Sequence, residues 1–81
     1  MPRGRRTHKP SRALLRRIGL NVAKRRRERG WSQPGLATRL GVNEMTISRI
    51  ERGLSNFAIG TLEHLAKKLG VSVEDLLGCQ P

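Results

Sequence analysis

The sequence is poor in aromatic residues and in cysteine. It has one Trp, one Phe and no Tyr among 81 residues, and its single cysteine is Cys79. Proteins that hold single-stranded nucleic acid stack bases on aromatic side chains, so this class is disfavoured. One cysteine cannot close an intramolecular disulfide, and no Cys/His cluster has zinc spacing. We therefore expect no metal, no cofactor and a reducing compartment, the cytoplasm.

Long hydrophobic runs are also missing. The basic N-terminus is followed by no apolar segment long enough for a signal peptide or a membrane span, so neither export nor a membrane partner is expected. Nothing supplies a nucleophile with its base, a metal cluster or a phosphate-binding loop. These absences disfavour an enzyme.

Acidic residues are scarce, and the charge is unevenly placed. The chain has 17 Lys and Arg against 6 Asp and Glu, a formal net charge of +11. Residues 1–29 hold twelve of the basic residues and one acid, whereas residues 30–81 hold five of each. The whole excess thus lies in the first third, as a solvated tail or as an arm that binds a polyanion such as nucleic acid.

The apolar spacing predicts helices only. We expect them at 12–29, 32–40, 43–52, 59–69 and 72–77, each begun by a capping residue or ended by a glycine. Residues 1–10 contain two prolines, one glycine and almost nothing apolar, which favours disorder. The predicted organisation is a basic flexible arm (1–11), one all-α domain (12–78) and a short C-terminal tail (79–81).

The second and third predicted helices form a motif with a tight turn, "SQPGLATRLGVNEMTISRIERG". A small residue at Ala37 lets the two helices approach, and Gly41 can adopt the positive φ of the turn. Val42, Ile47 and Ile50 are expected to fill the angle between the helices. This combination is more specific than any one of its positions.

Four segments keep the order and spacing of a known family: "RRRERGWSQ" (25–33), "LATRLGV" (36–42), "ISRIERG" (47–53) and "TLEHLAKKLGVSVEDLL" (61–77). The chain resembles the phage repressor and Cro helix-turn-helix family, also called the xenobiotic-response-element (XRE) family. The resemblance implies a compact, five-helix, lambda-repressor-like domain that binds duplex DNA with residues 43–52 in the major groove. It further implies a transcription regulator, mainly a repressor or autoregulator.

A helical projection of the third helix separates its two faces. With about 100° per residue, Ile47, Ile50 and Leu54 fall on the inward side. The outward arc carries Met45, Ser48, Arg49 and Arg52. The acids Glu44 and Glu51 lie on the flanks.

Four side chains at the front of this helix are candidates for base contacts. The planar fork of Arg49 matches the O6/N7 edge of guanine, although a solvated surface arginine is the alternative. Ser48 can bond a base edge or a phosphate, and Met45 is either loose packing or a contact to a thymine methyl group. Glu44 either stabilises the helix, because a negative charge is favourable at the positive end of the helix dipole, or accepts a hydrogen bond from cytosine N4 and disfavours wrong alignments of the helix on DNA.

The family resemblance implies two further roles. Gln33 is expected to contact a phosphate and to brace the third helix, or else it only provides a polar residue at the start of the second helix. Asn43, Arg52 and Asn56 are expected at the DNA backbone. Glu51 is expected to form a partly buried ion pair with Arg26.

Two positions depart from the family pattern. Arg25 stands where relatives usually have an apolar residue, so the first helix packs less tightly or the arginine stem passes along the core. Ala58 replaces a Ser-type cap before the fourth helix, which weakens that helix as a phosphate site.

The basic residues of the N-terminal arm have two possible roles. The arm's cations follow a phosphate strand or enter the minor groove, or else they only solubilise the chain; they are Arg3, Arg5, Arg6, Lys9 and Arg12. One such domain reads few base pairs, so a homodimer on a near-palindromic operator is expected. Its contacts are expected at Leu76, Leu77 and the surface of the fourth helix, which are otherwise part of the core. A toxin or other protein partner is left open, and the alternative function is a general nucleic-acid or ribosome-associated basic interaction protein.

Overall fold

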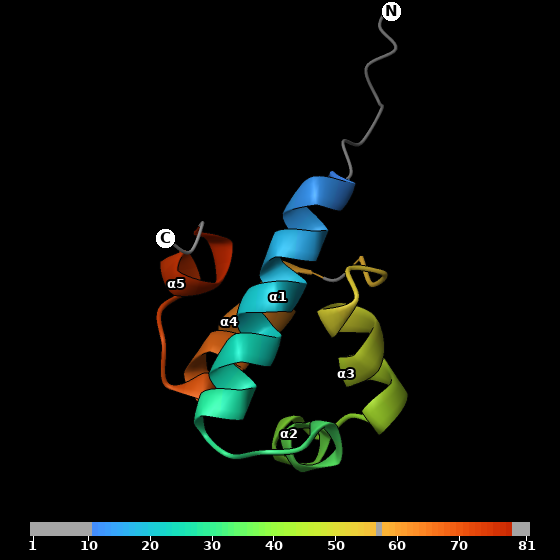
Figure 1. The fold of residues 1–81 in the computed structure, drawn as a ribbon, viewed down its shortest axis with the longest axis vertical. Helices are drawn as coiled ribbons and strands as arrows, with labels where there is room; N and C mark the ends of the chain where they lie inside the picture. Colours follow the sequence, from blue (N-terminus) through green and yellow to red (C-terminus); the bar gives the residue numbers. More distant parts are fainter. Residues whose placement is uncertain (1–10, 57, 79–81) are drawn as a thin grey trace, which may run out of the picture.

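Five helices make up the fold in the computed structural model, which describes residues 11–56 and 58–78 (Figure 1). Their bounds are α1 Arg12–Glu28, α2 Gln33–Leu40, α3 Glu44–Glu51, α4 Ile59–Leu69 and α5 Val73–Leu77. The all-α, five-helix prediction is confirmed, and each predicted helix end lies within one residue of the observed one. The expected arm residues Arg3, Arg5, Arg6 and Lys9, and the tail at 79–81, lie outside the described residues.

Side-chain caps explain where four of these helices begin. An oxygen of the residue before the helix accepts a hydrogen bond from a backbone N–H three residues later, which satisfies one of the free donors at a helix start. The caps are Ser11, Ser32, Asn43 and Ser72. The Asp75 carboxylate also accepts from the Ser72 N–H, and this backbone hydrogen bond lowers the pKa of Asp75. Ala58 provides no such cap for α4, as its side chain predicts.

The turn between α2 and α3 depends on Gly41. Its φ of 75° lies in the left-handed region that side chains disfavour, and the next N–H, of Val42, donates to the Ala37 carbonyl at 3.0 Å. Ala37, Ile47 and Ile50 are buried as expected. The prediction for Val42 was wrong, because this residue is 40% exposed: it follows the turn and lines the rim of an apolar hollow beside Leu40 and His64.

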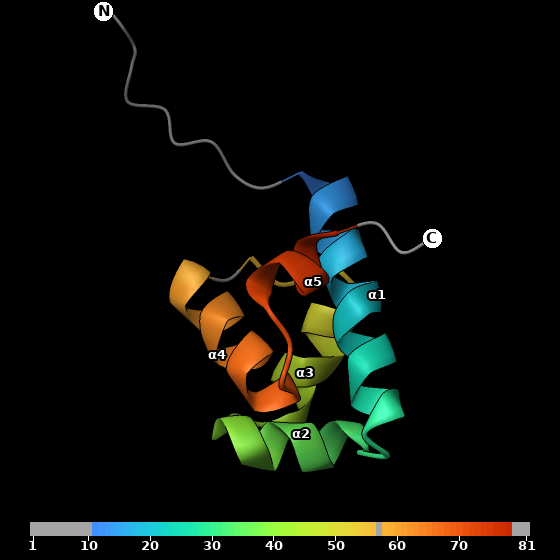
Figure 2. The same ribbon diagram turned by 90° about the vertical axis from the view of Figure 1, so that its left-hand side faces the viewer.

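The core lies among all five helices: α1 packs against α3, α4 and α5, and α2 packs against α3 and α4. Its fully or nearly buried members are Ile18, Val22, Leu36, Ala37, Ile47, Ile50, Leu62, Leu65, Ala66, Leu69 and Leu76. Figure 2 shows α5 between α4 and α1. Leu76 is therefore a core residue rather than a dimer contact, and Leu77 packs against the core from its edge.

Asn21 fastens α5 to α1. Asn21 is only 3% exposed, and its Nδ2 donates to the carbonyls of Leu76 at 2.7 Å and Gly78 at 2.8 Å. These carbonyls belong to the C-terminal end of a five-residue helix, whose last carbonyls lack partners within the helix. The bonds explain why a polar residue stands on the buried side of α1.

Arg25 borders the core without entering it. Its side chain is 27% exposed, and Nη1 lies 3.3 Å from Oε1 of Glu28. Nε is buried and has no hydrogen-bond partner among the described residues. The end of the guanidinium thus reaches an acid while the rest of the side chain is partly buried, and the expected passage of the stem along the core stays a prediction.

Gly19 allows α1 and α3 to touch through their backbones. A Cβ atom at this position would lie 2.4 Å from the Ile50 carbonyl oxygen and 2.6 Å from that of Glu51. Both atoms belong to the backbone and cannot rotate away. The close approach sets the position of α3, so it accounts for a glycine inside a 17-residue helix despite the poor helix propensity of glycine.

We predict that Gly19→Ala destabilises the protein by about 1–3 kcal/mol, because α1 and α3 must separate to admit the methyl group. Urea unfolding followed by circular dichroism measures this change. Gly60→Ala is the matched control, since no atom of residues 11–56 or 58–78 comes within 4 Å of a Cβ there and alanine is the better helix former. Equal stability of the two variants would contradict the assigned role of Gly19.

Candidate nucleic-acid interface

One face of α3 is buried and the opposite face is open. Ile47 and Ile50 are 0% and 2% exposed, whereas Met45 is 66% exposed. Glu44, Arg49 and Arg52 are also exposed, and Ser48 is half-buried. The helical projection fails only at Leu54, which is 46% exposed because it follows Gly53 and lies beyond the end of the helix.

The open face forms part of a shallow hollow of about 310 Å³, which we call the α3 hollow. Its lining residues are Gln33, Glu44, Met45, Ser48, Arg49 and Arg52. The structure thus brings together all four predicted base-contact residues and two of the predicted backbone contacts. Asn43 and Asn56 are exposed but do not line this hollow.

Asn43 serves α3 as its N-cap. Oδ1 accepts from the N–H and the hydroxyl of Thr46, each at 2.9 Å. The amide nitrogen of the same side chain carries two further donors. Capping and a DNA-backbone contact therefore use different atoms of Asn43 and are compatible.

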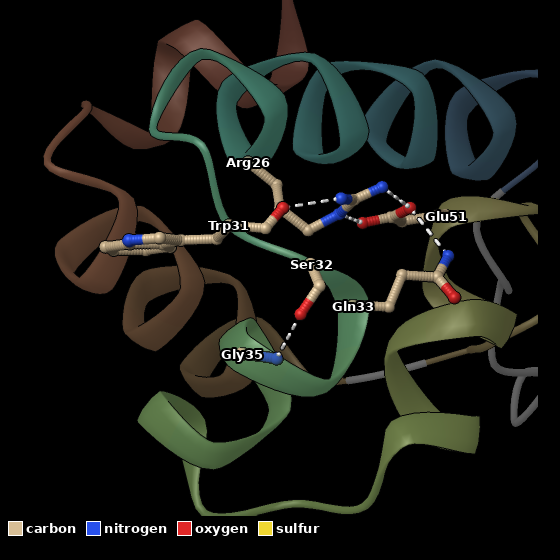
Figure 3. Close-up of polar contacts among 6 residues, drawn as sticks. All are labelled: Arg26, Trp31, Ser32, Gln33, Gly35 and Glu51. Carbon is tan, nitrogen blue, oxygen red and sulfur yellow. Dashed lines mark hydrogen bonds and ion pairs between the residues drawn. The ribbon is translucent and has the colours of Figure 1, made fainter.

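Behind the hollow, Arg26 of α1 and Glu51 of α3 form a buried ion pair (Figure 3). Arg26 Nε lies 2.7 Å from Glu51 Oε2 and Nη2 lies 3.1 Å from Oε1, so the contact is bidentate. Nη1 of Arg26 donates to the Trp31 carbonyl at 2.8 Å. The hydrogen bond with Glu51 raises the pKa of Arg26, which keeps the guanidinium charged.

Gln33 links this ion pair to the hollow. Its Nε2 donates to Glu51 Oε1 at 2.9 Å, as Figure 3 shows. An amide NH2 group has two hydrogens, so one donor remains after this contact. Gln33 therefore braces α3 from α2 while it also lines the α3 hollow.

Charge is distributed unequally around the hollow. Arg49 and Arg52 stand on its wall with a single acid, Glu44. The second acid of α3, Glu51, is neutralised by Arg26 and is 9% exposed. The surface that an incoming molecule meets is therefore cationic, with one negative charge at the first turn of α3.

A contact that the sequence pattern did not reveal involves the only tryptophan. The guanidinium carbon of Arg39 lies 4.0 Å from the centroid of the Trp31 ring and that of Arg29 lies 5.5 Å away. Arg29 Nε also donates to the Leu69 carbonyl at 2.9 Å. These contacts hold the link between α1 and α2 against the end of α4. In the sequence, the only indication of these contacts was the single tryptophan between Gly30 and Ser32.

In residues 11–56 and 58–78, no three His, Cys, Asp or Glu side chains are grouped so that they could hold a metal ion. None of the helices there has the length and apolarity needed to cross a membrane.

Two short helices joined by a tight glycine turn, with the second helix presenting an open polar face, define a helix-turn-helix protein. The model of the helix-turn-helix family HTH_3 matches residues 22–76, and the chain belongs to this family. The resemblance to the XRE group is thereby confirmed. The family consists of non-enzymatic transcription regulators.

Three similar proteins illustrate the family. An uncharacterised HTH-type transcriptional regulator, y4dJ of Sinorhizobium fredii, is 40% identical over 60 residues, which are 74% of this chain and 78% of that protein. The crystal structure of a hypothetical transcription factor, NHTF from Neisseria, superposes with a TM-score of 0.77 and 31% identity, covering 90% of this chain and 85% of that one. SinR, a master regulator for biofilm formation crystallised in complex with DNA, gives a TM-score of 0.69 and 40% identity, covering 75% and 98% of the chains.

We predict that Glu51→Ala lowers the free energy of unfolding by about 3–5 kcal/mol, because it leaves the buried Arg26 guanidinium without its carboxylate. Urea unfolding gives the value. Glu28→Ala is the control: it removes an acid that is 51% exposed, and such a surface pair contributes at most about 1 kcal/mol. If both variants unfold alike, the Arg26–Glu51 pair contributes no more than a surface pair.

Proposed function

We propose that the protein is a transcription regulator that binds duplex DNA with α3 in the major groove. The observation that carries the proposal is the cationic α3 hollow, whose lining combines the outward side chains of α3 with Gln33 of α2. An α-helix fits the width of the major groove, and the two-helix motif presents its second helix in this way. The similarity to SinR, which was crystallised in complex with DNA, supports DNA as the partner.

The residues of the hollow divide into two proposed roles. Arg49 donates to guanine O6 and N7, Ser48 bonds a base edge or a phosphate, and exposed Met45 contacts a thymine methyl group. Glu44 accepts from a cytosine amine and repels phosphates in a wrong register. These four side chains carry the sequence preference.

Phosphate contacts surround them and set the register on the duplex. Gln33 offers the amide hydrogen that Glu51 does not use, and Asn43 offers its amide nitrogen. Arg52 and Asn56 are exposed at the far end of α3. Arg12, an exposed residue at the start of α1, continues the phosphate contacts toward the basic residues that precede it.

The proposed assembly is a homodimer that acts in the cytoplasm as a repressor on a near-palindromic operator. An eight-residue α3 can reach only a few base pairs, so two copies about one helical turn apart are needed for a selective site. Ile59 is 71% exposed beside an apolar hollow that Leu14, Leu15 and Leu77 also line. This face of α4 and the start of α1 is the proposed dimer contact.

Selection from a random duplex library tests the proposal directly. Strong enrichment of a short, near-palindromic site is expected. Equal recovery of unrelated duplexes or RNA would instead support the alternative of a general nucleic-acid or ribosome-associated protein.

We predict that Arg49→Gln weakens binding to the selected operator by about 1–3 kcal/mol and relaxes selectivity at one guanine, because a bidentate base contact is lost. Fluorescence anisotropy with single-base operator variants measures both effects. Lys67→Gln, which removes a positive charge in the last turn of α4, is the control and should leave the preference unchanged. An unaltered preference at every position in Arg49→Gln would show that Arg49 does not contact a base.

We predict the opposite sign for Glu44→Gln: tighter binding with lower selectivity. The substitution removes a negative charge that faces the phosphates. It also replaces a carboxylate, which only accepts hydrogen bonds, by an amide that both accepts and donates and so discriminates less in favour of cytosine. The same anisotropy series, repeated at several salt concentrations, separates the two effects, since only the charge effect fades with salt. Selectivity equal to that of the unmodified protein would leave Glu44 with its dipole role alone.

A further inference from the structure

The outer face of α1 carries a second group of cations, separate from the α3 hollow. We call it the basic face of α1; it consists of Arg16, Arg17, Lys24 and Arg27 around Leu20. All five residues are exposed, and Leu20 itself is 62% exposed. Part of the net charge of the chain is thus displayed on a rigid helix and not only in the segment before it.

The protein itself makes little use of the charges of the three arginines on this face. Arg16, Arg17 and Arg27 form no hydrogen bond or ion pair with any residue that the structure describes, whereas Arg25 and Arg26 are both paired with acids. The one acid of α1, Glu28, is the partner of Arg25. No carboxylate in residues 11–56 or 58–78 lies at ion-pair distance from the three arginines, so their positive charge is directed outward.

The basic face and the α3 hollow point in different directions. Gly19 and Arg26 mark the side of α1 that contacts α3. At about 100° per residue, the four cations lie about 70–170° further around the helix. The hollow is on the side of α3 turned away from α1, because Ile50 and Glu51 face α1 while Met45 and Arg49 face outward. Among the four cations, Arg16 lies beside the end of α3, since its backbone is against Gly53. A straight duplex on α3 therefore leaves Arg17, Lys24 and Arg27 uncovered.

We propose that the basic face of α1 binds the sugar–phosphate backbone of a second duplex segment, without sequence preference. This proposal rests on the proposed function only in so far as the first duplex, the one on α3, is the operator. Arg16 and Arg27 are eleven residues apart, about 16 Å along the helix, which equals about five base-pair steps measured along the axis of a duplex. Three of the four cations are arginines, whose planar forks suit phosphate oxygens.

Leu20 is the only large apolar residue of this face, which is too little for insertion into a bilayer. The result of the second contact is a protein that holds two stretches of DNA at once. Such a protein can join distant operator regions, or pass from one duplex to another without full release.

The first experiment measures the affinity for an unrelated duplex as a function of salt. Arg16→Gln combined with Arg17→Gln should lower the steepness of log K against log salt by about 1.8, because each phosphate contact contributes about 0.9. The matched control is Lys67→Gln combined with Lys68→Gln, which removes the same charge from the exposed end of α4 and should change the slope little. Equal slopes in the two double variants would overturn the proposal.

The second experiment uses two duplexes. The selected operator is immobilised and saturated with the full chain, and recruitment of a fluorescent, unrelated duplex is measured. The unmodified protein should recruit this second duplex. The triple variant, with Arg16, Arg17 and Arg27 each changed to Gln, should still bind the operator but recruit at least tenfold less of the second duplex. Undiminished recruitment by the triple variant would place the second duplex elsewhere, and so overturn the proposal.

Two outcomes distinguish this proposal from the proposed function and from binding to a membrane surface. If no operator emerges from selection, the proposed function fails, yet the first experiment still decides the role of the basic face. If the basic face recruits vesicles of anionic lipid in place of the second duplex, and the salt slopes on DNA are equal, the partner is a membrane surface and our proposal is wrong.

Discussion

The buried ion pair between Arg26 and Glu51 is the interaction on which the rest of the structure depends. Removing two charges from water is costly, and the cost is offset only if the geometry is good and the remaining donors find partners. Here two hydrogen bonds join the charges, a third holds Arg26 to the Trp31 carbonyl, and a fourth brings Gln33 to the same carboxylate. One carboxylate thus fixes α1, α2 and α3 relative to one another. The α3 hollow is presented on this rigid support.

The backbone contact at Gly19 makes that geometry attainable. With α3 carbonyls against the side of α1, the guanidinium of Arg26 reaches Glu51 directly, without an intervening water. A small domain has little apolar surface to bury, so it relies on such short contacts between helices. The lost helix propensity of one glycine is small beside the cost of leaving a buried arginine unpaired.

The division of charge between α3 and α1 suits two kinds of DNA contact. The α3 hollow combines two arginines with Glu44, so its attraction for phosphate is tempered and its side chains can discriminate among base edges. The basic face of α1 has no acid and only one apolar residue, an arrangement that provides affinity without discrimination. Separating the two on different helices lets a selective contact and an unselective one coexist in a chain of 81 residues.

Local features of the sequence determined the five helices almost to the residue. Capping side chains, glycines at helix ends and apolar spacing act within one or two turns of the chain, and so does the projection that placed Met45, Arg49 and Ile47 on their correct faces. The partnership of Arg26 with Glu51 came from family resemblance, because spacing alone does not join residues 25 positions apart. Only the tertiary structure decided that Val42 and Leu54 are exposed, that Asn21 holds α5, and that Gly19 touches α3. These outcomes depend on the direction of the chain after a glycine turn and on how closely two helices approach, and no local pattern encodes either.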